Sequence, residues 1–97
     1  MQLRVVRRGG IAGVALEATV DTSELTDVDA ARAESELSDL PWDRPAVPAR
    51  YPDQFSYEVS VAGDNRTVVL REDEVPADLR PVLALLTQRG TIRPASS

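Results

Sequence analysis

Acidic side chains and arginines are the groups in this sequence that could do chemistry. Sixteen Asp and Glu residues accompany eleven basic residues, every one of them an arginine, and the chain contains no histidine and no cysteine. The usual general base near neutral pH, the commonest metal ligand and the thiolate nucleophile are therefore absent. No two acids are marked as a catalytic pair, and no acidic run has the alternating spacing of a calcium loop. The sequence argues against an enzyme and predicts neither a cofactor nor a metal site of the chain's own.

The charge balance and the hydropathy pattern narrow the classes of partner. The formal net charge is -5, whereas a nucleic-acid-binding protein usually carries a positive surface that contacts phosphates. The first residues enter an alternating pattern directly and offer no apolar signal segment, and no stretch approaches the roughly 18 apolar residues of a membrane span. We therefore expect a cytoplasmic protein that binds neither nucleic acid nor membrane and is monomeric when free.

A glycine-rich segment is the first candidate binding feature. Gly9, Gly10 and Gly13 surround Ile11 and Ala12, and glycines at this density permit the positive φ angles of a tight hairpin turn. One interpretation is a plain turn between two strands. The other gives Ile11 a role, because an exposed turn ordinarily carries Asn, Asp or Ser, and a large apolar side chain on a slim loop can enter a narrow pocket.

A proline-rich segment, residues 41–52, is the second candidate. It holds four of the seven prolines, which stiffen it, and loops of this length are commonly functional. The aromatic residues of the chain lie within or just after it: Trp42, Tyr51, Phe55 and Tyr57. Either Trp42 and Tyr51 fold back over a small core, or the segment forms a binding loop. In the first case Asp43 and Asp53 are solvated turn acids.

Periodicity predicts the elements that position these segments. Alternating apolar residues favour strands over residues 3–8, 14–21, 55–61 and 66–71, in two hairpins. Apolar spacings of three and four favour helices over residues 27–40 and 78–90. The predicted fold is α+β in the order ββαββα, a four-stranded antiparallel sheet with both helices on one face. Residues 1–90 would form a single domain and residues 91–97 a flexible tail.

The order of these elements has a consequence for the two candidate segments. A first helix that runs back along the sheet would deliver residues 41–52 to the end at which residues 9–13 connect the first hairpin. We therefore expect the two segments to be neighbours.

Four short stretches carry a resemblance to a known family. They are Arg7-Arg8-Gly9-Gly10-Ile11-Ala12-Gly13 after the first strand, Val20-Asp21 at the end of the second, Asp53-Gln54-Phe55-Ser56-Tyr57 at the start of the third, and Val75-Pro76-Ala77-Asp78-Leu79-Arg80 before the last helix. In this order and spacing they resemble the emfourin-like proteins, over residues 3–86. Members of this family are small bacterial inhibitors of thermolysin-type (M4) zinc metalloproteases, particularly of protealysin-like enzymes.

The resemblance implies a non-catalytic inhibitor that presents two adjacent loops to the cleft of a protease. One loop would bring an aspartate to the catalytic zinc, and the other would bring apolar side chains to the substrate pockets. Asp53 is the favoured zinc ligand and Asp43 is the alternative. The residues expected to contact the protease are Gly9, Gly10, Ile11, Ala12, Gly13, Trp42, Asp43, Tyr51, Asp53 and Phe55. The competing interpretation is a protein-interaction adaptor that uses the same loops on a partner that is not an enzyme.

Overall fold

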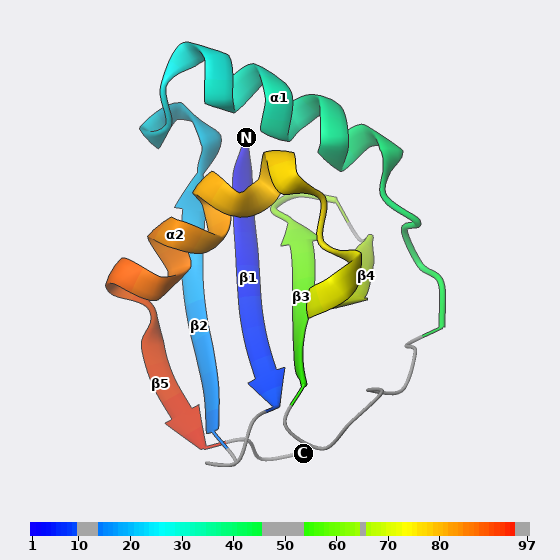
Figure 1. The fold of residues 1–97 in the computed structure, drawn as a ribbon, viewed down its shortest axis with the longest axis vertical. Helices are drawn as coiled ribbons and strands as arrows, with labels where there is room; N and C mark the ends of the chain where they lie inside the picture. The colour runs from blue at the N-terminus through cyan, green and yellow to red at the C-terminus, as the bar shows by residue number, and fades with distance from the viewer. Residues whose placement is uncertain (10–13, 46–53, 65, 95–97) are drawn as a thin grey trace.

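One antiparallel sheet and two helices organise the chain (Figure 1). The structure is a computed structural model that describes residues 1–9, 14–45, 54–64 and 66–94. The strands lie in the order β4-β3-β1-β2-β5, and each neighbouring pair is antiparallel. Their bounds are β1 Gln2–Gly9, β2 Val14–Asp21, β3 Phe55–Val61, β4 Thr67–Arg71 and β5 Thr91–Pro94, and the helices are α1 Asp27–Asp39 and α2 Arg80–Arg89.

The predicted α+β class with two helices is confirmed, but the sheet has a fifth strand. β5 pairs with the first half of β2, where Ile92 lies opposite Leu16. The prediction of four strands followed by a flexible tail is therefore wrong for residues 91–94, and residues 95–97 lie outside the described residues. Four residues are too few to show a periodic pattern, and β5 forms because pairing with β2 satisfies backbone groups of both strands.

The core lies between the sheet and the two helices. Leu3 and Val5 of β1 are buried beside Val20 and Ala18 of β2, on the face that the alternation predicts. Helix side chains at a spacing of four complete the same apolar cluster: Ala33 and Leu37 of α1, and Val82 and Leu86 of α2. Both helices therefore pack on the same face, as predicted. A bilayer-spanning helix is absent from the described residues, since α1 has 13 residues and α2 has 10, whereas a span needs about 20.

α1 crosses the end of the sheet at which β1 begins, rather than running along the strands (Figure 1). The Thr26 hydroxyl starts this helix by accepting a hydrogen bond from the Asp29 amide (3.1 Å), which is the usual role of an N-cap. The chain then meets β4, where the Asp43 amide donates to the Thr67 carbonyl (2.9 Å). The expectation that α1 delivers all of residues 41–52 to the glycine-rich end is thus wrong for residues 41–45.

An ion pair ties α2 to the connection between β2 and α1. The Arg89 guanidinium donates two hydrogen bonds to the Glu24 carboxylate and one to the Thr19 carbonyl (2.9 Å). The bonds from Arg89, together with one from the Asp21 backbone amide, lower the pKa of the Glu24 carboxyl from 4.5 to about 2. The folded state therefore favours the charged form of Glu24.

We expect acid to weaken the fold through Glu24 between pH 4.5 and about 2, and Glu24→Gln to reduce that loss. A carboxyl whose pKa is lower in the folded state stabilises the fold above its unfolded pKa, and this contribution disappears as the pH falls through the folded pKa. Melting temperatures recorded across this pH range test the prediction. Asp39→Asn, which removes one exposed acid of α1, is measured beside it as the matched loss of a surface carboxylate. A Glu24→Gln curve parallel to the wild-type curve would contradict the prediction.

Candidate functional site

The described flanks of the two candidate segments meet at one end of the sheet. Gly9, the last residue of β1, pairs with Phe55, the first residue of β3. The chain therefore enters residues 10–13 beside the point at which it returns from residues 46–53. The candidates within these segments, and the expected contact between the two loops, lie outside the described residues and stay predictions: Gly10, Ile11, Ala12, Gly13, Tyr51 and Asp53.

Gly9 has two reasons to be glycine. Its φ of 102° lies in the region that favours glycine over residues with a side chain. A Cβ at this position would also lie 2.4 Å from the carbonyl oxygen of Gln54. That oxygen belongs to the backbone and cannot rotate away, so the close approach of the two chains depends on the missing side chain.

Gln54 anchors the chain immediately after Asp53. Its side chain is 2% exposed, and its Nε2 donates to Oδ1 of Asp73 (3.4 Å) in the turn after β4. The next backbone amide, that of Phe55, donates to Oε1 of Glu72 (3.4 Å). A buried polar side chain needs such partners in place of water. These bonds hold the backbone at a fixed point one residue from Asp53. Sequence reasoning included Gln54 in a stretch that carries the family resemblance but did not foresee its anchoring role, because a lone polar residue before a strand does not reveal its partners.

Arg7 and Phe55 form a stacked pair at the same end of the sheet. The guanidinium carbon of Arg7 lies 4.5 Å from the centre of the Phe55 ring, which is the geometry of a cation–π contact. Both side chains are half-buried. Sequence reasoning likewise did not foresee the role of Arg7, although a signal was available. It continues the alternation of Leu3 and Val5, so an arginine stands where the pattern expects an apolar residue.

Trp42 packs on the core at the other end of the sheet. Its Nε1 donates to the Leu37 carbonyl (2.8 Å), and its ring is among the partly buried groups that contact the apolar cluster. The Arg66 guanidinium covers it, 5.5 Å from the ring centre. Trp42 therefore covers the core, which is the first of the two interpretations offered for the aromatic residues.

Asp43 is bound to the outer edge of β4. Its φ is 61°, and its carboxylate accepts a hydrogen bond from the Thr67 amide (3.3 Å). Thr67 pairs with Ser60, which stands five residues along β3 from Phe55, or about 17 Å at the usual rise of a strand. The structure therefore brings Gly9 and Phe55 together but leaves Asp43 at the opposite end.

Arg44 and Glu74 complete the cover of this edge. Arg44 donates to the Val69 carbonyl (3.1 Å) and to Glu74 (2.6 Å), and Glu74 accepts from the Arg71 amide (2.9 Å). The bonds from Arg44 and from the Arg71 backbone lower the pKa of the Glu74 carboxyl. Four outward backbone groups of β4 thus have hydrogen-bond partners within the chain: the amide and carbonyl of Thr67, the carbonyl of Val69 and the amide of Arg71.

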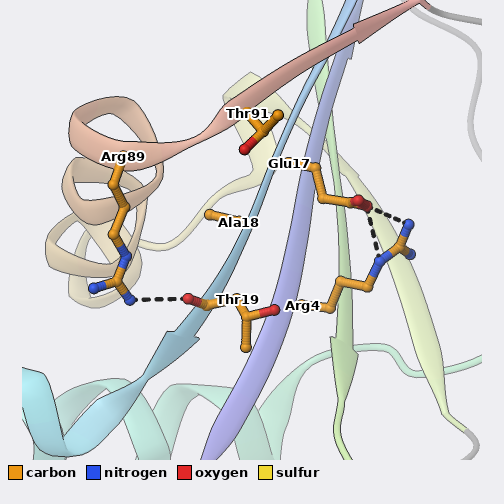
Figure 2. A pocket seen from close by; sticks show the side chains of 6 residues that line it. All are labelled: Arg4, Glu17, Ala18, Thr19, Arg89 and Thr91. Carbon is orange, nitrogen blue, oxygen red and sulfur yellow. Dashed lines mark hydrogen bonds and ion pairs between the residues drawn. The ribbon is translucent and has the colours of Figure 1, made fainter.

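A surface pocket of about 260 Å³ lies beside the middle of β2, away from the end of the sheet at which Gly9 pairs with Phe55 (Figure 2). Its guanidinium groups are engaged, because Arg4 donates to Glu17 (2.6 Å) and Arg89 donates to the Thr19 carbonyl (2.9 Å). Across the ranges that the structure describes, no group of three acids is arranged to hold a metal ion. The pocket is lined by Arg4, Glu17, Ala18, Thr19, Arg89 and Thr91.

Most of the chain, including the Gly9–Phe55 junction and its supports, matches a known family model. The family is described as Emfourin, and the match covers residues 5–87. It runs from β1 into α2, so it includes both flanks of the Gly9–Phe55 junction. No curated protein and no solved structure matches the chain.

Proposed function

Because this chain belongs to the Emfourin family, we propose that it is a protein inhibitor of a thermolysin-type zinc metalloprotease. Family membership is the observation that carries the proposal, and it points to a protease inhibitor rather than to an enzyme. The pairing of Gly9 with Phe55 supports the finer statement that residues 10–13 and 46–53 act together. We infer a bacterial protealysin-like enzyme as the target class.

Asp53 is the side chain that we assign to the zinc of the protease. A catalytic zinc keeps an open position that normally holds water, and a carboxylate oxygen is an acceptable ligand there. Displacing this water removes the nucleophile that peptide hydrolysis needs. Two observations favour Asp53 over Asp43. Asp53 adjoins the anchored Gln54, whereas the carboxylate of Asp43 is bound to Thr67 at the far end of the sheet.

Ile11 supplies the main apolar contact in this proposal, with Gly10, Ala12 and Gly13 keeping its loop slim. Thermolysin-like enzymes prefer bulky apolar residues beyond the scissile bond, so the isoleucine side chain would occupy the substrate pocket that accepts them. The anchored junction at Gln54 has a second effect. A rigid base lowers the entropy lost on binding and holds the chain out of register for cleavage.

Titration of a thermolysin-type protease with the purified chain tests the proposal. We expect peptide hydrolysis to fall as the chain is added, while the chain itself stays intact. An adaptor for a partner that is not an enzyme would leave hydrolysis unchanged or be digested, and either result would contradict inhibition. A serine protease assayed in parallel is the control, because it offers no zinc to a carboxylate.

A further inference from the structure

Among the residues that the structure describes, Arg7 occupies a strand position whose cross-strand neighbours are uncharged. It lies on the helix-bearing face of β1, and its partners across the strands are Leu16 of β2 and Tyr57 of β3. Its guanidinium rests on the ring of Phe55. A charged group in such a place loses part of its hydration, and no acid of the described residues pairs with it in return.

The arginines on the other face of β1 are neutralised within the protein. Arg4 pairs with Glu17 (2.6 Å) and with Glu58 (3.6 Å), and Arg8 pairs with Glu58 (3.2 Å). Arg7, in contrast, makes no hydrogen bond and no ion pair within the described part of the chain, where its contact is the Phe55 ring. This is notable in a protein whose acids outnumber its bases by sixteen to eleven.

We propose that Arg7 is a preformed binding site for a carboxylate group on the partner protease. A guanidinium presents its donors as a rigid planar fork that matches the two oxygens of a carboxylate. The Phe55 ring holds that fork in place before binding, so less side-chain freedom is lost when the pair forms. The ion pair between Arg7 and that carboxylate would also offset the free-energy cost of the partial dehydration of Arg7.

The position of Arg7 specifies where the carboxylate must lie. Along the chain, Arg7 precedes residues 10–13 by three positions and Phe55 follows Asp53 by two, so we expect the stacked pair to lie near both proposed contacts. The partner group is then an acidic side chain on the rim of the protease cleft, between the zinc and the pocket for Ile11. This inference rests on the proposed function, because it requires a protease to approach this end of the sheet.

Arg7→Leu separates charge recognition from packing, because leucine still covers the Phe55 ring but has no charge and no donors. Arg7→Gln, which is polar and neutral, is measured beside it. The matched control is Arg8→Leu, because the adjacent side chain lies on the opposite face and pairs with Glu58. Inhibition constants against a thermolysin-type protease are compared at about 50 mM and about 500 mM NaCl, since salt screens charge pairs. Melting temperatures verify that each variant is folded.

We expect both Arg7 variants to raise the inhibition constant about tenfold at low salt and by much less at high salt. Arg8→Leu should change it by less than about twofold. Unchanged inhibition by the Arg7 variants overturns the carboxylate site while the inhibitor function stands. A loss of equal size at both salt concentrations also overturns it, because the contact is then apolar packing. If the wild type does not inhibit at all, the proposed function fails and this inference fails with it.

Discussion

Asp53→Asn should raise the inhibition constant about thirtyfold or more, which corresponds to about 2 kcal/mol of binding free energy. Asparagine keeps the size of the side chain but replaces an anionic oxygen ligand by a neutral amide, which is a poor match for zinc. Because residue 53 precedes the anchor at Gln54 rather than forming it, the melting temperature should not change. Peptide hydrolysis by a thermolysin-type protease, measured against inhibitor concentration, gives the inhibition constant directly.

Asp43→Asn distinguishes the two aspartates. Its carboxylate accepts a hydrogen bond from the Thr67 amide at the edge of β4, and the amide oxygen of asparagine can accept the same bond. This substitution should therefore change the melting temperature little and leave inhibition close to the wild-type level. The reverse pattern, in which Asp43→Asn abolishes inhibition and Asp53→Asn does not, would transfer the zinc contact to Asp43. Full inhibition by both variants would show that neither carboxylate reaches the metal.

Gly9→Ala should destabilise the fold by about 3 kcal/mol or more. One part of this cost is the positive φ of 102°, which costs a residue with a side chain about 1 to 2 kcal/mol. The other part is steric, because the new Cβ would lie 2.4 Å from the Gln54 carbonyl oxygen and one of the two chains must shift. Chemical denaturation of wild type and variant measures the difference, since a domain of this size is expected to unfold in two states.

Gly63→Ala is the matched control for this steric cost. Gly63 also has a positive φ, of 81°, but nothing lies within 4 Å of the Cβ that alanine would add. The expected loss is therefore the conformational part alone, about 1 to 2 kcal/mol. If the two alanine variants lose the same stability, the approach of Gly9 to Gln54 is not a constraint on the fold, and the rigid junction assumed for the inhibitory loops would need another basis.

Local pattern predicted most of the fold because each element repeats its signal over several residues. The alternation of residues 55–61 gave the bounds of β3, and the apolar spacings of three and four over residues 27–40 gave α1, which ends one residue earlier, at Asp39. β5 was missed because its four residues owe their conformation to β2, which is a distant partner. Pairing between distant segments leaves no period in the sequence.

The candidate site was predictable in part, for the same reason. The first hairpin is confirmed, since β1 ends at Gly9 and β2 begins at Val14, whereas the binding role of its loop stays a prediction. The direction of α1 across the sheet depends on helix packing, which periodicity does not encode. Residues 41–45 were therefore assigned to the wrong end, and Trp42 with them. The role of Arg7 was not predicted because it depends on a contact with Phe55, which is distant in the sequence and adjacent only in the folded sheet.

The cover over β4 by Asp43, Arg44 and Glu74 has a consequence for behaviour in concentrated solution. A bare outer strand is a template on which further molecules can add one after another, and such growth leads to fibrils. In this protein, an added strand would first have to displace the side chains that already bond to the outer edge of β4. These bonds therefore oppose self-assembly of the protein on the β4 side of the sheet.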